Sequence, residues 1–438
     1  MSAWFDSSAS WLAANPQWLG LALFLIACTE CLAIVGLLVP GTLLLFSVAV
    51  LAGSGALSLG QTLVLGYAGG LLGDGLSYAL GRYFHQDIRR LPGLRHHPQW
   101  LSGAEGYFQR YGIASLLVGR YIGPLRPMLP MVAGMFNMPL GRFIAVSLVA
   151  AAGWAVAYLL PGWATGAALR LPLPPGFWSQ AAVLASGLGL LLLVSIQSSL
   201  RKRRHASLVS AGACLLLLLG LFLAWPQFAE LDQGLLALVQ EQRSPGLDEW
   251  MVLITRLGNI DAQLAAGMLL CLLLLLARQW RAALFAGVTL LGSALANGTL
   301  KDLFARHRPD VLLEPLDSFS FPSGHSSAAF AFFLVLGVLA GRGQPVRLRL
   351  AWLVLASLPA LAIALSRVYL GAHWPTDVIA GALLACSLCA LSLSLSQWRT
   401  PLAPLSARIW WLVLPGCLAL LGAIATWHLS ASLLLYRH

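Results

Sequence analysis

The chain has 438 residues, of which 59% are hydrophobic and only 10% are charged. A soluble globular protein carries about 25% charged residues, so this composition excludes that class and indicates a lipid bilayer as the solvent. The formal net charge of +11 does not indicate nucleic-acid binding, because basic residues such as those at 201–204 adjoin apolar runs, where they fix topology and meet lipid headgroups. We therefore predict an all-α integral membrane protein. No Lys or Arg precedes Arg82, and we expect no signal peptide at residues 1–16.

Two apolar stretches of the first half contain helix breakers in their middle. Residues 17–52 are interrupted at Pro40-Gly41, and residues 111–138 are interrupted at Gly123-Pro124. Each stretch is followed by a continuous apolar run long enough to span a bilayer, 57–81 and 143–163. The basic loop between them places the two interrupted stretches on opposite faces of the membrane. We therefore expect an inverted repeat with two re-entrant hairpins, an arrangement typical of transporters.

Four ionisable residues lie within these apolar stretches. Glu30 belongs to the first hairpin, Asp74 to the helix that follows it, and Arg120 and Arg126 flank the break of the second hairpin. A charge at the centre of a membrane helix costs on the order of 2.5–3.5 kcal/mol on insertion scales, and such a cost usually marks a functional residue. The alternative is that these acids and bases form structural ion pairs that neutralise the hairpins.

The basic stretch after residue 200 is the clearest boundary in the chain. We expect four parts: a membrane domain at 1–200, a cytoplasmic linker at 201–206, a second membrane domain at 207–400, and an additional transmembrane helix at 401–438. Apolar runs predict the following spanning helices around and after this boundary: 179–200, 207–225, 262–277, 282–300, 326–340, 350–365, 376–396 and 409–429.

The charges of the second half fix its orientation. With the linker in the cytoplasm, alternation of the spans brings the Arg-containing loops at 277–281, 341–349 and 397–408 to the same side. The acid-rich segment 226–261 then lies on the opposite side, as the positive-inside rule requires. The three motifs described next would all face the outer, periplasm-like side.

The first motif is a pair of cations. Lys301 is followed after six residues by Arg308 and Pro309. A spacing of seven residues is about two helical turns, so both cations would face one way. Such a pair suits a phosphate dianion, because a guanidinium binds two oxygens at once. Arg306 and His307, which lie between them, fill no required role, and we expect them in local packing or headgroup contacts.

The second motif is Pro322-Ser323-Gly324-His325 at the start of the apolar run 326–340. A helix that begins here points free N–H groups outward, and its dipole favours an anion at the same place. Gly324 allows a close approach of the backbone, and Ser323 adds a hydroxyl. The motif therefore predicts an anion site at a helix start.

The third motif contains Arg367, His373 and Asp377. Pro375 suits the first turn of a helix, and Asp377 lies one turn after His373. Asp377 can accept the Nδ1–H of His373 and leave Nε2 free as a nucleophile. We expect the intervening Tyr369 to serve only in packing or headgroup contacts.

These three motifs, in this order and near the ends of membrane helices, resemble the type 2 phosphatidic acid phosphatase family. The resemblance covers about residues 207–397 and implies a six-helix lipid phosphatase bundle that needs no metal and no cofactor. It further implies that His373 attacks phosphorus to give a phosphohistidine, that Asp377 orients it, and that His325 protonates the leaving group and later activates water. The residues that would hold the phosphoryl oxygens are Lys301, Arg308, Ser323, Gly324 and Arg367.

The first half resembles the DedA family of membrane proteins over about residues 10–200. The resemblance is carried by Glu30, Pro40-Gly41 and the stretch Gly119-Arg120-Tyr121-Ile122-Gly123-Pro124-Leu125-Arg126 with Pro130 and Ala133-Gly134. It implies lipid translocation, with polyprenyl phosphate carriers as a leading cargo and roles for Glu30, Arg120 and Arg126. Thr42 stands where the family often has an Asp, and Asp74 is the acid that could substitute for it.

Together these features predict a bifunctional protein of the bacterial inner membrane. Its second half would convert a lipid pyrophosphate, best undecaprenyl pyrophosphate, to the monophosphate at the periplasmic face, and its first half would carry that monophosphate across the membrane. One alternative is a phosphatase for phosphatidic acid or phosphatidylglycerophosphate with a non-transporting or ion-coupled first half. A weaker alternative is haloperoxidase chemistry. The expected partners are membrane lipids, polyprenyl or glycerophospholipid phosphates and no nucleic acid, with a homo-oligomer left open.

Overall fold

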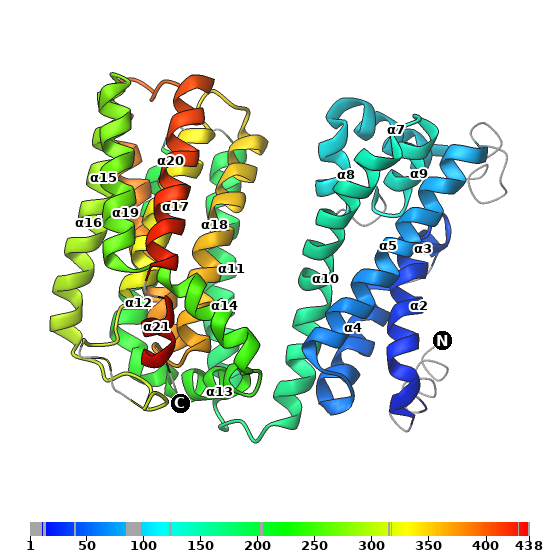
Figure 1. Ribbon diagram of the computed structural model, residues 1–438, viewed down its shortest axis with the longest axis horizontal. Coiled ribbons are helices and arrows are strands. Elements are labelled where there is room, and N and C mark those ends of the chain that lie inside the picture. Colours follow the sequence, from blue (N-terminus) through cyan, green and yellow to red (C-terminus); the bar gives the residue numbers. More distant parts are fainter. Residues whose placement is uncertain are drawn as a thin grey trace. The chain divides into compact units, whose positions relative to one another are not determined.

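The computed structural model describes residues 11, 15–38, 41–84, 98–121, 125–201, 205–313, 316, 318–427 and 429–436. All regular elements among these residues are helices (Figure 1). Eight of the described helices are long and apolar enough to cross a membrane, or up to nine if Pro245–Arg256 and Ile260–Leu276 form one bent span. The prediction of an all-α membrane protein is therefore confirmed. The chain divides into two compact units, Met1–Pro172 and Leu173–His438.

The first unit combines short, broken helices with two long ones. Its elements are η1 (Pro16–Trp18), α2 (Leu19–Cys31), α3 (Val35–Leu38), α4 (Gly41–Leu51), the π-helical turn η2 (Ala52–Ala56), α5 (Leu59–Phe84), α7 (Pro98–Tyr111), α8 (Ile113–Gly119), α9 (Met128–Met135) and α10 (Leu140–Arg170). The long helices α5 and α10 pack against each other, and the short helices α2, α4 and α9 pack on them. Gly69 and Gly73 allow α5 to lie on the backbone of α2, because a Cβ there would collide with a main-chain carbonyl.

The first hairpin turns earlier than its predicted break. Helix α2 ends at Cys31, Leu32 is extended, and Ile34 takes a positive φ of 71°, which is unfavourable for a β-branched residue. Helices α2 and α4 then pack against each other, as do α8 and α9 on the two sides of the second break. The predicted breakers Pro40, Gly123 and Pro124 lie outside the described residues.

The second unit is a bundle of long helices. Its elements are α11 (Phe177–Leu200), α12 (Ala206–Ala224), η5 (Trp225–Phe228), α13 (Ala229–Gln240), α14 (Pro245–Arg256), α15 (Ile260–Leu276), α16 (Trp280–Phe304), α17 (Gly324–Ala340), α18 (Val346–Tyr369), α19 (Pro375–Ser396), α20 (Ala407–Thr426) and α21 (Leu429–Leu435). Helices α12 and α15 to α19 correspond to the six-helix bundle, and α20 packs on α15 as the additional helix.

The structure assigns α11 to the second unit, which differs from the boundary expected at residue 200. Helix α11 packs on α12 and α13, with Leu184 and Leu188 in contact with the apolar side chains of the bundle. Its start is tied to α13, because the backbone N–H of Leu231 donates to Gln180 Oε1 at 2.8 Å. The Pro-containing stretch 170–176, rather than the basic stretch 201–206, therefore separates the two units; residues 202–204 lie outside the described part.

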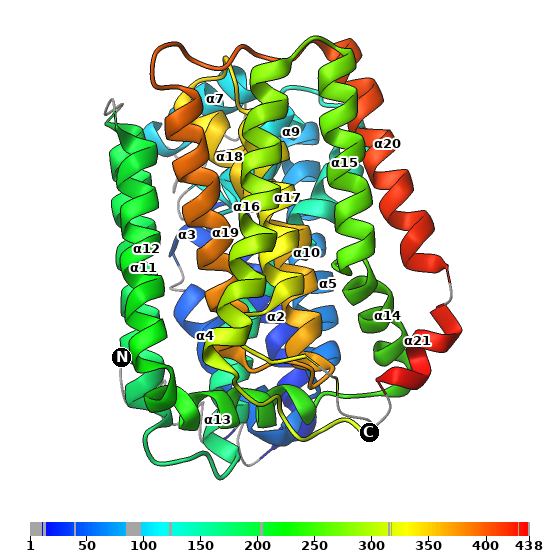
Figure 2. The ribbon, with the colours of Figure 1, turned by 90° about the vertical axis from the view of Figure 1, so that its left-hand side faces the viewer.

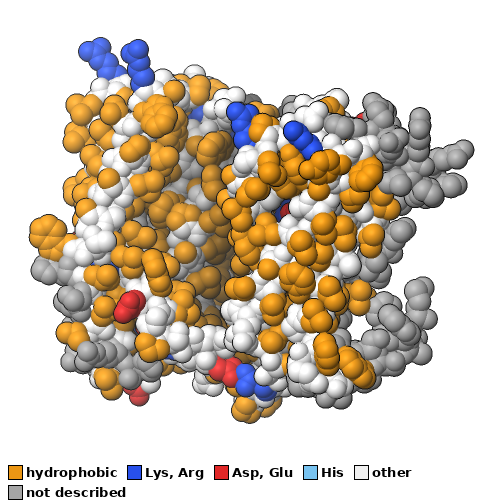
Figure 3. Space-filling view, turned by 45° about the vertical axis from the view of Figure 1, so that its right-hand side comes forward, with side chains coloured by type: hydrophobic (Ala, Val, Ile, Leu, Met, Phe, Trp, Pro, Cys, Tyr) orange, Lys and Arg blue, Asp and Glu red, His pale blue; other side chains and the backbone are white. Residues whose placement is uncertain are grey.

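Helix α17 is the centre of this bundle. It packs against α15, α16, α18 and α19, and almost all of its side chains from Ser326 to Leu339 are buried. A helix that is apolar on every side has to be surrounded by other helices. The outer helices instead expose large hydrophobic side chains, such as Leu216 and Leu223, and Figure 3 shows such side chains covering the flanks of the helices. This is the surface expected in contact with lipid.

Successive helices of the bundle alternate in direction (Figures 1 and 2). As a result, the Arg-containing loops 277–279, 341–345 and 397–406 lie at one end of the second unit, together with the start of α12. The loops 305–323 and 370–374, which carry the predicted phosphatase motifs, lie at the opposite end.

Candidate functional site

The three motifs converge at one end of the second unit. Lys301 lies in the last turn of α16, the second motif begins α17, and the turn that connects α18 to α19 carries the third. Gly371 makes this turn with a φ of 69°, and a Cβ on it would lie 2.8 Å from Val311. Glycine therefore lets the third motif pack directly against the loop that follows the first.

His373 is almost fully buried, with 1% of its surface exposed. Its Nδ1 lies 3.5 Å from Asp377 Oδ2, and Ser320 bridges the two, with its Oγ 3.3 Å from Nδ1 and a hydrogen bond to the same carboxylate oxygen. On the other edge of the ring, Nε2 lies 3.1 Å from Arg308 Nη1. Because an arginine N–H only donates, Nε2 must accept with its lone pair, and the proton belongs on Nδ1. This is the tautomer that a nucleophilic Nε2 requires.

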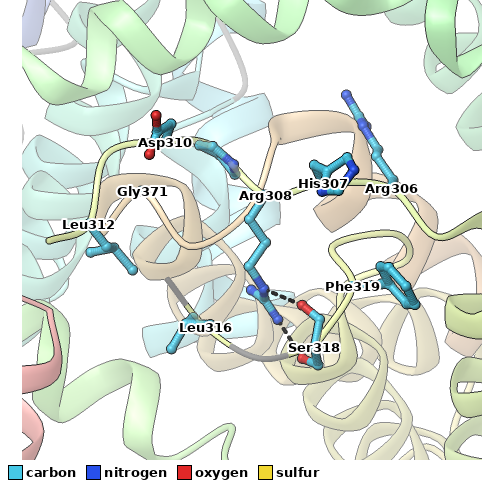
Figure 4. A pocket seen from close by; sticks show the side chains of 10 residues that line it. Arg306, His307, Arg308, Asp310, Leu312, Leu316, Ser318, Phe319 and Gly371 are labelled. Atoms are coloured by element: carbon cyan, nitrogen blue, oxygen red, sulfur yellow. Dashed lines mark hydrogen bonds between the residues drawn. The ribbon is translucent and has the colours of Figure 1, made fainter. Parts of the chain in front are cut away.

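Arg308 is held in place by neutral oxygens. It donates to the carbonyl of Ser318 at 2.7 Å, to Ser318 Oγ at 2.8 Å and to the carbonyl of Ala372 at 2.6 Å; Figure 4 shows the two bonds to Ser318. Lys301 Nζ also reaches Ser318 Oγ, at 3.4 Å. Arg308 lines a cavity of about 370 Å³ together with Leu312, Phe319 and other residues of the same loop. The two cations of the first motif therefore do lie together.

Helix α17 begins at the second motif. Ser323 is the N-cap, and its Oγ accepts a bond from the backbone N–H of Ser326 at 3.4 Å. The N–H of Ser323 donates to the carbonyl of Asp377 at 2.9 Å, which ties the second motif to the third. A Cβ on Gly324 would lie 3.2 Å from Asn297 Oδ1, so little space remains on that side of the helix start.

His325 has a partner that the sequence did not suggest. Its Nε2 lies 2.9 Å from Oδ1 of Asn259, the residue that precedes α15. This contact fixes the orientation of the imidazole ring from a helix outside the three motifs. The signal available in the sequence was Gly258-Asn259 just before an apolar run, which by itself indicates only a helix start.

Arg367 is buried with 1% exposure and has one free edge. Its Nη1 donates to Thr255 Oγ1 at 3.0 Å and to the hydroxyl of Tyr436 at 2.7 Å. Its Nε has no hydrogen-bond partner within the described residues. A buried donor without a protein partner is costly and rare, and an oxygen of a bound ligand could satisfy it.

Arg306 contradicts the expected packing or headgroup role. It is 7% exposed and pairs with two carboxylates, Asp377 Oδ1 at 2.6 Å and Asp232 Oδ2 at 2.7 Å. Asp232, on α13, also accepts from the N–H and the hydroxyl of Thr376 at 2.9 and 2.6 Å. Aromatic rings flank the guanidinium, with Trp225 4.6 Å away. The result is a chain of contacts from Asp232 through Arg306 and Asp377 to His373.

Sequence reasoning missed this chain because its parts are far apart in the sequence. Asp232 precedes the first motif by about 70 residues, as the separation of 74 residues to Arg306 shows. The only available hint was that Asp232 adjoins an apolar segment, where an unpaired charge is costly. Tyr369 also has a defined structural contact, since its hydroxyl accepts from the N–H of Ser244 at 3.1 Å.

The electrostatics of the site favour the uncharged form of His373. Burial lowers the pKa of His373 well below its usual value of 6.5, and the surrounding cations, Arg308 first, lower it further. Burial and the charge of Arg367 lower the pKa of Arg308 to about 10. At neutral pH the site therefore combines a neutral imidazole with a charged guanidinium. The same interactions indicate that His325, Lys301 and Arg367 all lie within electrostatic reach of His373.

In the first unit, the four predicted ionisable residues form two buried ion pairs. Arg120 pairs with Asp74, and Arg126 pairs with Glu30. Thr42, which stands where the DedA family often has an Asp, donates to Glu30 Oε1 at 2.9 Å. The second acid of the cluster is thus Asp74 on α5, and the helices on both sides of the two breaks contribute to one site.

Trp154 of α10 lies between the two arginines. Its ring is 5.0 Å from Arg120 Cζ and 5.7 Å from Arg126 Cζ, and it is fully buried. Several donors of this cluster have no partner within the described residues: Arg120 Nε, Arg126 Nε and Nη1, and Trp154 Nε1. The unpaired acceptors are Glu30 Oε2 and Asp74 Oδ1. The two ion pairs therefore leave much of the hydrogen-bonding capacity of the cluster unused.

Family models match both parts of the chain. A model for the PAP2 superfamily matches residues 281–401, and a model for the VTT domain matches residues 39–164. The first range includes every predicted phosphatase residue, and the second includes Asp74, Arg120 and Arg126. The chain is a fusion of a DedA-family VTT domain with a PAP2-superfamily domain.

Individual relatives agree with this assignment. Inner membrane protein YabI of Escherichia coli strain K12 is 38% identical over 152 residues, which is 35% of this chain and 60% of that protein. Inner membrane protein YqjA of the same strain is 30% identical over 157 residues, 35% of this chain and 71% of that protein. The chain thus spans about 60% of the length of YabI. The similarity to these inner membrane proteins and the apolar helices identify the chain as a multi-pass membrane protein.

A solved structure is also similar to this chain. It is the crystal structure of a transmembrane PAP2 type phosphatidylglycerolphosphate phosphatase from Bacillus subtilis, 29% identical, covering 43% of this chain and 97% of that chain with a TM-score of 0.39. Through the PAP2 superfamily match, the second unit is a domain of the lipid phosphatase type.

Proposed function

We propose that the PAP2 domain hydrolyses a lipid phosphate or pyrophosphate through a phosphohistidine, with undecaprenyl pyrophosphate as the first candidate substrate. One observation carries this proposal: the lone pair of His373 Nε2 faces Arg308, and the charges of Arg308, Arg367 and Lys301 all act on this buried imidazole. A nucleophile and phosphate-binding donors thus meet at one buried point. No other cluster among the described residues combines a neutral imidazole with free cationic donors.

The first step forms a bond from His373 Nε2 to phosphorus and breaks the bond from phosphorus to the leaving oxygen. As phosphate enters, Arg308 exchanges its contact with Nε2 for a phosphoryl oxygen, which releases the lone pair for attack. Asp377, through Ser320, stabilises the positive charge that develops on the imidazole. His325, held by Asn259, donates a proton to the leaving oxygen.

In the second step, His325 takes a proton from water, whose oxygen attacks phosphorus while the P–N bond breaks and inorganic phosphate leaves. Lys301, Arg308 and Arg367 neutralise the charge of the transferring group, and the backbone at the start of α17 donates hydrogen bonds to it. Because three cations surround it, we propose that the reaction needs no metal ion.

We further propose that the site faces the periplasm. The Arg-rich loops gather at the opposite end of this unit, and basic loops stay in the cytoplasm. A cysteine introduced at exposed His307 in place of the histidine, near the site, should react with a membrane-impermeant maleimide in intact spheroplasts. A cysteine in place of exposed Arg399 should react only after the membrane is opened. The reverse pattern would reject this orientation.

For the VTT domain we propose translocation of the lipid monophosphate that the PAP2 domain releases. The support is the buried cluster of Arg120 and Arg126, whose unpaired donors suit the oxygens of a phosphate group. The location inside a set of broken helices matches the place where transporters bind charged substrates.

The proposal is tested with the purified full chain. Phosphate release should be compared for undecaprenyl pyrophosphate, phosphatidic acid and phosphatidylglycerophosphate at equal mole fractions in detergent micelles, with His373→Ala as the blank. Preference for the pyrophosphate supports the assignment, whereas preference for a glycerophospholipid supports the alternative substrate class. Movement of undecaprenyl phosphate across reconstituted vesicles tests the VTT domain separately, and its absence would reject translocation.

A further inference from the structure

The segment after the last long helix folds back beside the phosphatase site. Helix α20 ends at Thr426, and α21 packs against α14. Arg256 of α14 fastens this segment by donating to the carbonyls of Ala425 at 2.6 Å, Ile424 at 3.1 Å and Trp427, and to Ser432 Oγ. A single guanidinium therefore holds both sides of the turn between α20 and α21.

This fastening brings Tyr436 to the site. The side chain is 7% exposed, and its ring packs in one apolar cluster with Leu312, Tyr369, Leu370 and Ala372. Leu312 follows the first motif, and the other three belong to the third motif and its turn. The carbonyl of Tyr436 is also held, because it accepts from Arg243 at 3.2 Å. Tyr436 is thus positioned from three directions.

The hydroxyl of Tyr436 binds a phosphate-site arginine directly. It accepts a bond from Arg367 Nη1 at 2.7 Å, and the guanidinium carbon lies 5.5 Å from the tyrosine ring. A phenol accepts through oxygen and donates its own proton, and this proton has no acceptor among the described contacts. Arg367 Nε is likewise buried without a partner. Arg367 and Tyr436, which are both buried and hydrogen-bonded to each other, thus each keep one donor without a partner among the described residues.

We propose that Tyr436 is a further residue of the phosphate-binding site, which holds Arg367 in position and donates its O–H to a phosphoryl oxygen of the lipid phosphate. The inference rests on the proposed phosphatase function, because it assumes that Arg367 binds phosphate. It extends the site beyond the PAP2 match, since Tyr436 and α21 lie outside residues 281–401. A segment that contains none of the three motifs would then contribute to binding of the phosphoryl group.

Tyr436→Phe tests the inference, because it removes the hydroxyl and keeps the ring in its cluster. Tyr78→Phe is the matched control, since it deletes another buried hydroxyl, which donates to the carbonyl of Met138 in the other unit. The first measurement is the rise in unfolding temperature of the detergent-solubilised full chain on addition of inorganic phosphate or orthovanadate, which needs no turnover. We expect the apparent dissociation constant of both anions to rise about 10–100-fold in Tyr436→Phe, as for loss of one hydrogen bond to a charged group, and to stay unchanged in Tyr78→Phe.

The second measurement is hydrolysis of phosphatidic acid in micelles. We expect KM to rise with a smaller change in kcat for Tyr436→Phe. Arg256→Met, which releases α21 and leaves Tyr436 intact, should reproduce this change in KM. Unchanged anion binding in Tyr436→Phe would overturn the inference, and tighter binding or faster hydrolysis in either variant would show that the segment obstructs the site instead. If the wild type binds phosphate but hydrolyses no lipid phosphate, the proposed function fails while the anion-binding result still decides the role of Tyr436.

Discussion

The two domains bury arginine in different ways. In the VTT domain, Arg120 and Arg126 are each paired with a carboxylate, Asp74 and Glu30. A phosphate that binds there has to compete with a carboxylate already in place. The charges of the empty site cancel, which lowers the cost of burying them inside the membrane, and the proposed translocation would use the same balance to release a charged headgroup.

In the PAP2 domain, one arginine pairs with the buried carboxylates, and two others remain available to a phosphoryl group. Arg306 pairs with both Asp232 and Asp377. Within the described part of the chain, Arg308 and Arg367 contact neutral groups only. Their charge can therefore act fully on a phosphoryl group. Paired arginines suit reversible carriage of a phosphate, whereas free arginines suit stabilisation of a transition state.

The largest expected effect is on the nucleophile. His373→Ala should lower lipid phosphate hydrolysis at least about 1,000-fold, because the covalent step has no other nucleophile. His307→Ala, in the exposed part of the same loop, should stay within twofold of the wild type. Both are measured as initial rates of phosphate release. Normal turnover in His373→Ala would disprove the mechanism and remove the contrast between the two domains.

The next largest effect distinguishes the function of the VTT domain from that of the PAP2 domain. Arg120→Gln should abolish movement of undecaprenyl phosphate across vesicles and leave hydrolysis within twofold, because the residue lies in the VTT domain alone. The single change also leaves Asp74 as an unpaired buried charge, which destabilises the fold by about 3–5 kcal/mol. Unfolding temperature should therefore fall in this variant.

The double variant Arg120→Gln with Asp74→Asn resolves function from stability. It removes both charges, so the unfolding temperature should return close to that of the wild type while transport stays absent. If transport returned together with stability, the pair would be structural only, and the site for the headgroup would have to lie elsewhere.

The long elements of the fold were predictable because a spanning helix leaves a strong, local signal. The run 376–396 became α19 at Pro375–Ser396, and the run 207–225 became α12 at Ala206–Ala224. The partner of α11 was not predictable. Both of its neighbours are apolar in sequence, and only the packing of Leu184 and Leu188 shows which unit it joins.

In the site, the sequence indicates residues that occur in short motifs and misses those that act across the fold. His373, Asp377 and Arg308 were predicted from spacing, whereas Asn259 and Tyr436 contact site residues 66 and 69 positions away. Such long-range contacts leave no pattern in one sequence. Their common feature is a polar group next to an apolar run, which is too frequent to identify a site.

A smaller effect is expected for Asp232, which does not contact His373 and is linked to it through Arg306 and Thr376. Asp232→Asn removes one of the two charges on Arg306, so Arg306 is drawn toward Asp377 and the carboxylate holds His373 less well. We expect kcat to fall about 10-fold with KM within twofold. Asp261→Asn, an exposed acid at the start of α15, should change neither. A rise in KM with normal kcat would show that Asp232 shapes the substrate pocket instead.

The smallest effect concerns pH. Attack requires neutral His373, and burial with the charge of Arg308 lowers the pKa of this histidine well below 6.5. The neutral form is present above the folded pKa and is lost only as pH falls through that value. The acid limb of kcat/KM, which reports the loss of neutral His373, should therefore lie well below pH 6.5, whereas an unshifted histidine would place it near 6.5. In Arg308→Gln, which removes the nearest cation, the acid limb should move toward higher pH. An acid limb centred near 6.5 in the wild type would mean that the cations do not act on His373. The free arginines of the PAP2 domain would then have no electrostatic effect that the paired arginines of the VTT domain lack.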